Sequence, residues 1–258
     1  MATGLLRWPV DVLARPKVLV ASRADEETDS VAHAIVTSLR ISVFYFANLL
    51  LYALPLTIAG FGVVNESAAP EGFAAFAEPL VNDPDAAWQL SSALVQNSAF
   101  LFVATVLTFV TFHLGVVLTR SSDGIVRSLR TVSYSTGIYL AVMFTVVWYV
   151  ATAPGIRVAD EFLLALQAEF FYFFIDLVGV NLELPGGRPE AVDLGRLTRT
   201  GQAMFVVLLL SAVYYLYVLY LGARISHQST RLEAIIAVFF VTISPAIYVL
   251  GVIVTSTL

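Results

Sequence analysis

Long apolar runs alternate with short polar turns along most of this chain. Five of the runs are predicted to be membrane spans, at about 41–64, 93–118, 132–153, 202–221 and 234–254. A helix rises ~1.5 Å per residue, so about twenty apolar residues cross a hydrocarbon core of ~30 Å. The pattern therefore predicts an all-α protein: a polytopic membrane helix bundle with five transmembrane helices.

The first forty residues lack such a run and are predicted to form a separate arm. Residues 1–40 mix apolar and basic side chains around Pro9 and Pro16, and proline is tolerated only in the first turn of a helix. This arm either lies on the inner membrane surface or packs on the helices. We therefore divide the chain into an N-terminal cytoplasmic arm at 1–40 and a transmembrane helical domain at 41–258.

A further apolar stretch, at 162–180, carries two acids and is harder to place. Glu169 and Asp176 share one face of a helix over this stretch. Acids are costly at the centre of a bilayer, so such a helix either lies in the interface or turns its acids inward. We expect an amphipathic interfacial or re-entrant outer helix here, and a full crossing would give six spans.

Arginines in two short turns predict the orientation of the bundle. One turn joins the second and third spans, and the other joins the fourth and fifth. Short basic loops stay in the cytoplasm, whereas the acidic segment 65–90 contains no lysine or arginine and is predicted to be external. The N-terminus is then cytoplasmic, in a multi-pass protein of the cell membrane. The residues at the two turns are Arg120, Arg127, Arg130, Arg224, His227 and Arg231.

The composition agrees with a membrane protein and excludes several other classes. Hydrophobic residues make up 59% of the 258 residues and charged residues 13%, whereas soluble proteins have ~25% charged residues. The chain has no cysteine, and its three histidines lie far apart in the sequence, so no metal site and no cofactor are predicted. A net charge of -5 without a basic tract argues against a nucleic-acid partner.

Polar side chains within the apolar runs are candidates for intramembrane function. Tyr45 and Asn48 fall on one face of the first predicted span. His113 lies seven residues before Arg120, which places it ~10 Å from the inner boundary. Either interhelical packing or a substrate or proton path would use such groups. The candidate intramembrane polar residues are Tyr45, Asn48, His113, Tyr134, Glu169 and Asp176.

Several short motifs lie beside the basic turns. Residues 13–17 read Leu-Ala-Arg-Pro-Lys, 112–114 read Phe-His-Leu, and 127–135 read Arg-Ser-Leu-Arg-Thr-Val-Ser-Tyr-Ser. Residues 217–227 read Tyr-Val-Leu-Tyr-Leu-Gly-Ala-Arg-Ile-Ser-His, followed by Arg-Leu-Glu-Ala at 231–234. Together they resemble the prokaryotic branch of the Ypt-interacting (Yip) family of integral membrane proteins. The resemblance implies five spans, a cytoplasmic N-terminus and no catalytic centre. Eukaryotic members of the family bind lipidated Rab-type GTPases, whereas the prokaryotic branch has no agreed function.

Two functions from different classes follow from these observations. The first is a non-enzymatic membrane scaffold, or a subunit of a membrane complex, with membrane lipid and other membrane or cytoplasmic proteins as partners. If the two hairpins pack together, their basic turns form one cytoplasmic face, whose arginines offer planar forks to carboxylates. The alternative is a transporter or ion-conducting subunit that uses the intramembrane polar residues. The spans contain no paired acids, HExxH or GxSxG motif, so no enzymatic activity is predicted.

Overall fold

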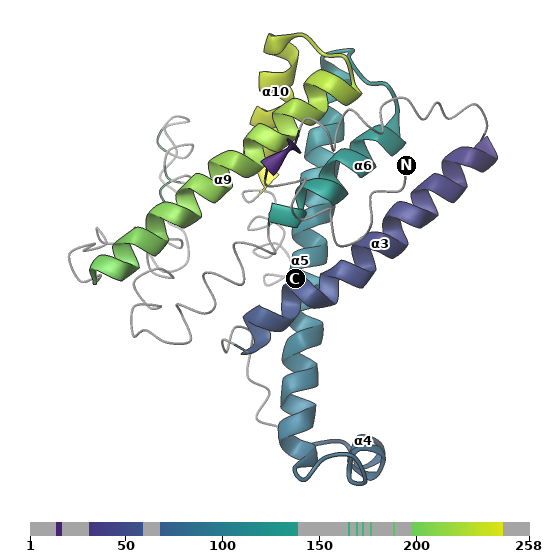
Figure 1. Ribbon diagram of the computed structural model, residues 1–258, viewed down its shortest axis with the longest axis vertical. Coiled ribbons are helices and arrows are strands. Elements are labelled where there is room, and N and C mark those ends of the chain that lie inside the picture. The colour runs from purple at the N-terminus through teal and green to yellow at the C-terminus, as the bar shows by residue number, and fades with distance from the viewer. Residues whose placement is uncertain are drawn as a thin grey trace.

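Every regular element that the structure describes is a helix, and no strand occurs among the described residues (Figure 1). The prediction of a helical protein is therefore confirmed. The computed structural model describes residues 14–16, 31–58, 68–138 and 198–244, with the single positions Ala165, Glu169, Tyr172, Asp176 and Arg188. The helices in these ranges are α3 (Val31–Ile58), α4 (Glu71–Ala77), α5 (Pro84–Leu118), α6 (Ile125–Ser135), α9 (Arg199–Ser226) and α10 (Arg231–Thr242).

Among the described residues, three helical stretches are long and apolar enough to cross a membrane: Ala34–Ile58, Pro84–Leu118 and Leu209–Ser226. They overlap the predicted first, second and fourth spans. The greater part of the predicted third span, at 139–153, and about half of the predicted fifth span, at 245–254, lie outside the described residues. The structure thus supports a helical membrane protein, and the number of five spans stays a prediction.

Two helices begin earlier than the apolar pattern predicts. α5 begins at Pro84 instead of near residue 93, and the carboxylate of Asp83 accepts a hydrogen bond of 3.0 Å from the Ala86 N–H. An N-terminal aspartate cap followed by proline is a strong helix start, so this helix begins in polar sequence. α3 begins at Val31, inside the predicted arm at 1–40, because its first ten residues include no proline or glycine to stop a helix.

The helix after the first basic turn is short and buries a face of small polar residues. α6 follows Gly124, whose φ is 110°, and begins before the predicted start of the third span at Val132. Ser128, Thr131 and Ser135 of α6 are buried, and the helix contacts α3, α5 and α9. Small side chains let backbones approach closely, which allows α6 to fit among three other helices.

α5 is the central helix of the described part of the chain. It contacts α3, α4, α6 and α10, and α9 contacts α6 and α10 (Figure 1). Phe112 and Val116 of α5 and Leu219 of α9 are fully buried in the shared core. A Cβ atom added at Gly115 would stand 2.6 Å from the Cα atom of Ala237 in α10. The backbones of α5 and α10 therefore lie in direct contact at this point.

Candidate functional site

The two basic turns lie together at one end of the helices (Figure 1). Residues 119–124 join α5 to α6, and residues 227–230 join α9 to α10. The Ser229 hydroxyl donates a hydrogen bond of 2.9 Å to the Ser121 hydroxyl, and the Asp123 N–H donates one of 3.0 Å to His227 Nδ1. Segments about a hundred residues apart in the sequence thus form one unit, which we call the two-turn junction.

Each turn of the junction contains one non-glycine residue in the left-handed region. Arg120 has a φ of 56° and Gln228 a φ of 51°. This conformation ends a helix and lets the next N–H groups return to its last carbonyl groups. The Ser121 N–H accordingly bonds to Val116 O at 3.0 Å, and the Ser229 N–H bonds to Ala223 O at 3.3 Å. Both helices end at a left-handed residue, although the returning bond spans five residues at Ser121 and six at Ser229.

A chain of hydrogen bonds runs from the junction into the helices. His227 Nδ1 accepts a backbone N–H, so it carries a lone pair, and the proton of the neutral ring is on Nε2. Nε2 lies 3.1 Å from the Ser128 hydroxyl oxygen, which lies 2.9 Å from His113 Nδ1. His227 donates to Ser128, whose own proton is then available to His113. His227 is only 2% exposed and Ser128 is fully buried. Their polar atoms therefore form hydrogen bonds with one another and with other protein groups instead of with water.

His227 is a neutral structural link at physiological pH. Burial lowers its pKa to about 4, and the nearby charge of Arg127 adds to this effect, while the Asp123 carboxylate opposes it. A second proton would enter at Nδ1 and displace the Asp123 N–H. The chain of hydrogen bonds also ends at this backbone amide, which is not a proton source. The arrangement therefore supports a role in packing and not in proton transfer.

Two of the predicted partner-binding arginines are used inside the junction. Arg127 Nη1 lies 2.5 Å from the Asp123 carboxylate and donates to the Ser226 carbonyl oxygen at 2.9 Å. Arg224 donates to the carbonyl oxygen of Ser229. Together with His227, these arginines hold α6, α9 and the two turns to one another. The sequence could not show these roles, because the carbonyl partner of Arg127 is 99 residues away along the chain.

Two of the other predicted partner-binding residues leave more surface to solvent. Arg120 and Arg231 are exposed at the two turns, and Arg130 is half-buried on α6. The structure thus places Arg120 and Arg231 at the surface of the junction, whereas Arg127 and Arg224 have internal partners. Sequence reasoning missed Ser121, Ser128 and Ser229, because small hydroxyl side chains give no recognisable spacing.

The predicted intramembrane polar residues of α3 make hydrogen bonds that serve packing. The Tyr45 hydroxyl donates to the Thr105 hydroxyl of α5 at 3.0 Å. Asn48 Nδ2 donates to the Phe44 carbonyl oxygen at 2.7 Å. The Tyr134 ring of α6 lies 5.1 Å from the Phe44 ring, measured between centroids. Tyr45 thus joins α3 to α5 and Tyr134 joins α6 to α3, whereas the Asn48 bond stays within α3.

The two predicted intramembrane acids share one arginine partner. Arg188 donates to both carboxylate oxygens of Glu169, at 3.1 and 3.0 Å, and to Asp176 at 3.4 Å. Its guanidinium carbon lies 5.1 Å from the centroid of the Tyr172 ring. Each of the three charged side chains is about half exposed. Most of 162–180 lies outside the described residues, so its interfacial or re-entrant position stays a prediction.

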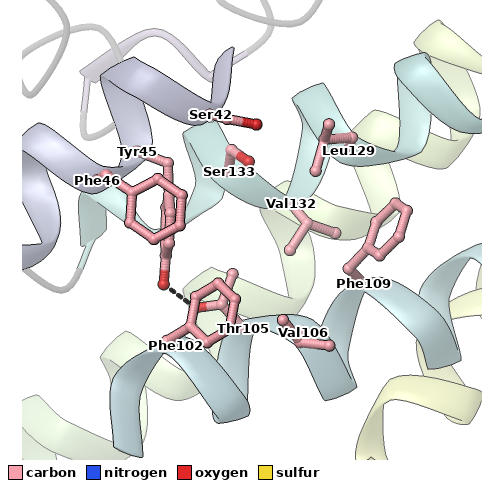
Figure 2. A pocket seen from close by; sticks show the side chains of 10 residues that line it. All are labelled: Ser42, Tyr45, Phe46, Phe102, Thr105, Val106, Phe109, Leu129, Val132 and Ser133. Atoms are coloured by element: carbon pink, nitrogen blue, oxygen red, sulfur yellow. Dashed lines mark hydrogen bonds between the residues drawn. The ribbon is translucent and has the colours of Figure 1, made fainter. Parts of the chain in front are cut away.

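An apolar groove between α3, α5 and α6 was not predicted from the sequence. Figure 2 shows its side chains, with the Tyr45 hydroxyl directed at Thr105 across the groove. The cavity volume is about 90 Å³. No local pattern could reveal it, because three separate segments contribute its walls. The lining residues are Ser42, Tyr45, Phe46, Phe102, Thr105, Val106, Phe109, Leu129, Val132 and Ser133.

A functional assignment for this chain rests on its own sequence and structure. No protein-family model, curated protein or solved structure matches this chain.

Proposed function

We propose that the chain is a non-enzymatic integral membrane scaffold, or a subunit of a membrane complex, that docks an acidic protein through the two-turn junction. The observation that carries this proposal is the contact between the two turns through the Asp123–His227 and Ser121–Ser229 hydrogen bonds. This contact brings two basic segments together into one surface. The Yip resemblance, the five spans and the cytoplasmic N-terminus belong to the same proposal.

Within this surface the arginines divide into two groups. Arg127 and Arg224 hold the junction together through internal contacts. Arg120 and Arg231 are exposed and supply the planar, bidentate donors that a carboxylate accepts. We therefore assign docking to Arg120 and Arg231, beside the half-buried Arg130.

The transporter alternative remains a separate hypothesis with less support. Tyr45 and Asn48 form hydrogen bonds within the packed helices, and Glu169 and Asp176 share Arg188. His113 bonds to Ser128. These groups form hydrogen bonds with separate partners. A transport path would instead need them to line one water-filled cavity.

Replacement of the two exposed arginines by lysine tests the docking proposal. Lysine keeps the positive charge that orients a membrane protein but lacks the planar fork. The double variant Arg120→Lys/Arg231→Lys is expected to insert normally. In mild detergent, the amount of an acidic protein that copurifies with it should be at least tenfold lower than with the parent. Arg199→Lys is the matched control, since Arg199 is exposed at the first residue of α9. If the double variant retains every partner of the parent, docking through these arginines is wrong.

A further inference from the structure

We propose that the groove between α3, α5 and α6 holds part of one acyl chain of an anionic membrane phospholipid, whose phosphate lies beside Arg40 and Arg130. This inference rests on the membrane location in the proposed function but not on protein docking. The proposed lipid site lies where α3, α5 and α6 meet. The groove, its open side and the cations at one end each support it.

The walls of the groove suit a hydrocarbon chain. Aromatic and aliphatic side chains supply most of the lining (Figure 2). The Tyr45 hydroxyl is bonded to Thr105, which in turn bonds to the Leu101 carbonyl oxygen at 2.9 Å. The hydroxyls of Tyr45 and Thr105 are therefore satisfied inside the protein, so an apolar occupant leaves neither of these two without a partner.

The groove opens towards the side of the helices. Phe46 and Phe102 are 51% and 39% exposed, and their rings stack at 5.6 Å on one edge of the groove. α3 and α5, which carry them, both contain candidate membrane spans. The open side of a groove between two spans faces lipid, so an acyl chain can enter without crossing water.

The size of the groove excludes larger occupants. Its volume is about 90 Å³, below the ~150 Å³ of an engineered cavity that binds benzene. Binding sites for drug-sized molecules occupy ~300–1,000 Å³, and a helix of a partner protein is ~10 Å wide. A few methylene groups of a thin, flexible chain fit this space, whereas a whole helix or a drug-sized molecule does not.

Two arginines lie towards one end of the groove. α3 and α6 run in the same direction, and α5 runs opposite (Figures 1 and 2). Phe44 of α3 and Tyr134 of α6 are in ring contact, and Arg40 and Arg130 each precede one of them by four residues, about one helical turn. Both cations therefore lie one turn from this contact on the same side, towards the two-turn junction. An anionic headgroup is the complement of such a pair.

Native mass spectrometry of the purified full chain tests the lipid site. The probes are phosphatidylglycerol and phosphatidylcholine with identical acyl chains. Val106→Phe narrows the groove, and Val110→Phe is its matched control, since Val110 is exposed on the same helix outside the lining. We expect the parent and Val110→Phe to retain one phosphatidylglycerol, and Val106→Phe to retain about tenfold less. If the two variants retain equal amounts of phosphatidylglycerol, the bound lipid is only annular lipid, and the proposal is overturned.

The headgroup part of the site is tested separately. Arg40→Gln/Arg130→Gln is expected to bind both lipids alike, and a preserved preference for phosphatidylglycerol would contradict the assignment. Phe46→Trp gives a readout that does not depend on the folding of Val106→Phe. Its added fluorescence should be quenched by one equivalent of phosphatidylglycerol with brominated chains, and unchanged emission would refute the site. The lipid experiments measure bound lipid, whereas the docking experiment measures copurified protein. The lipid proposal and the docking proposal can therefore be contradicted independently of each other.

Discussion

At the scale of single residues, the most informative group is His227. The Asp123 N–H bonds to its Nδ1, the Ser128 hydroxyl lies against its Nε2, and the ring is almost fully buried. A backbone amide can only donate, so it fixes one neutral tautomer of the ring. Protonation of His227 must break the Asp123–His227 hydrogen bond, which is one of two that join the turns.

The stability of the protein should therefore fall in acid through His227. Its ordinary pKa is 6.5 and its pKa in the folded protein is about 4, so the unfolded chain binds the extra proton first. The stabilisation is complete above pH 6.5 and is lost as the pH falls towards 4, by about 3 kcal/mol at 1.36 kcal/mol per pH unit. Thermal unfolding in detergent at pH 7.5 and 4.5 measures this change. His227→Gln should be less stable at pH 7.5 and lose this pH dependence; an unchanged slope would assign the effect to other groups.

Ser128 connects the two histidines, and its removal should destabilise the fold. Ser128→Ala leaves His227 Nε2 and His113 Nδ1 without their partner, and each such loss inside a protein costs ~1–3 kcal/mol. Ser211→Ala is the control, because Ser211 bonds only within its own helix, to the Val207 carbonyl oxygen, and is expected to change stability by less than ~0.5 kcal/mol. Chemical denaturation compares the two. Equal effects would mean that the buried link contributes nothing.

At the scale of helices, glycine and small polar residues determine how closely the elements pack. Gly115 lies against the backbone of Ala237, and a Cβ atom at Gly222 of α9 would stand 2.1 Å from Thr131 Cγ2 of α6. The first contact joins α5 to α10 and the second joins α6 to α9. Helices in membranes commonly associate through such small residues, because lipid provides no hydrophobic drive for their contact.

Gly115→Ala should weaken the contact between α5 and α10. The new methyl group meets backbone atoms of Ala237, which cannot move unless α10 moves, and overpacking of this kind costs ~1–3 kcal/mol. Gly72→Ala is the matched control in α4, where an added Cβ atom meets nothing within 4 Å and alanine favours the helix by up to ~1 kcal/mol. The unfolding temperatures of the two variants should therefore change in opposite directions. A Gly115→Ala variant as stable as the parent would contradict the close approach.

The apolar pattern predicted elements better than their contacts. Runs of twenty apolar residues identify candidate spans because length and hydropathy are local properties. The pattern missed the early start of α5, since the Asp83 cap extends the helix through polar sequence. It also assigned Arg127 and Arg224 to a partner, whereas their internal carbonyl partners arise only when α6, α9 and the turns meet. The groove was missed for the same reason.

At the scale of the whole molecule, the central claim is that two basic turns form one surface on the cytoplasmic side. The two-turn junction and α4 lie towards opposite ends of α5 (Figure 1), which is 35 residues long. The segment 65–90 around α4 is acidic and without basic residues. The positive-inside rule therefore predicts the junction in the cytoplasm and α4 outside.

Single-cysteine labelling in intact cells tests this claim most directly. The chain has no cysteine of its own, and Ser122, Gln228 and Glu78 are exposed. A membrane-impermeant thiol reagent should label Glu78→Cys and leave Ser122→Cys and Gln228→Cys unlabelled until the cells are opened. Labelling of only one of Ser122→Cys and Gln228→Cys from outside would place the turns on opposite sides of the membrane and contradict the two-turn junction. Labelling of both from outside would contradict the cytoplasmic docking surface.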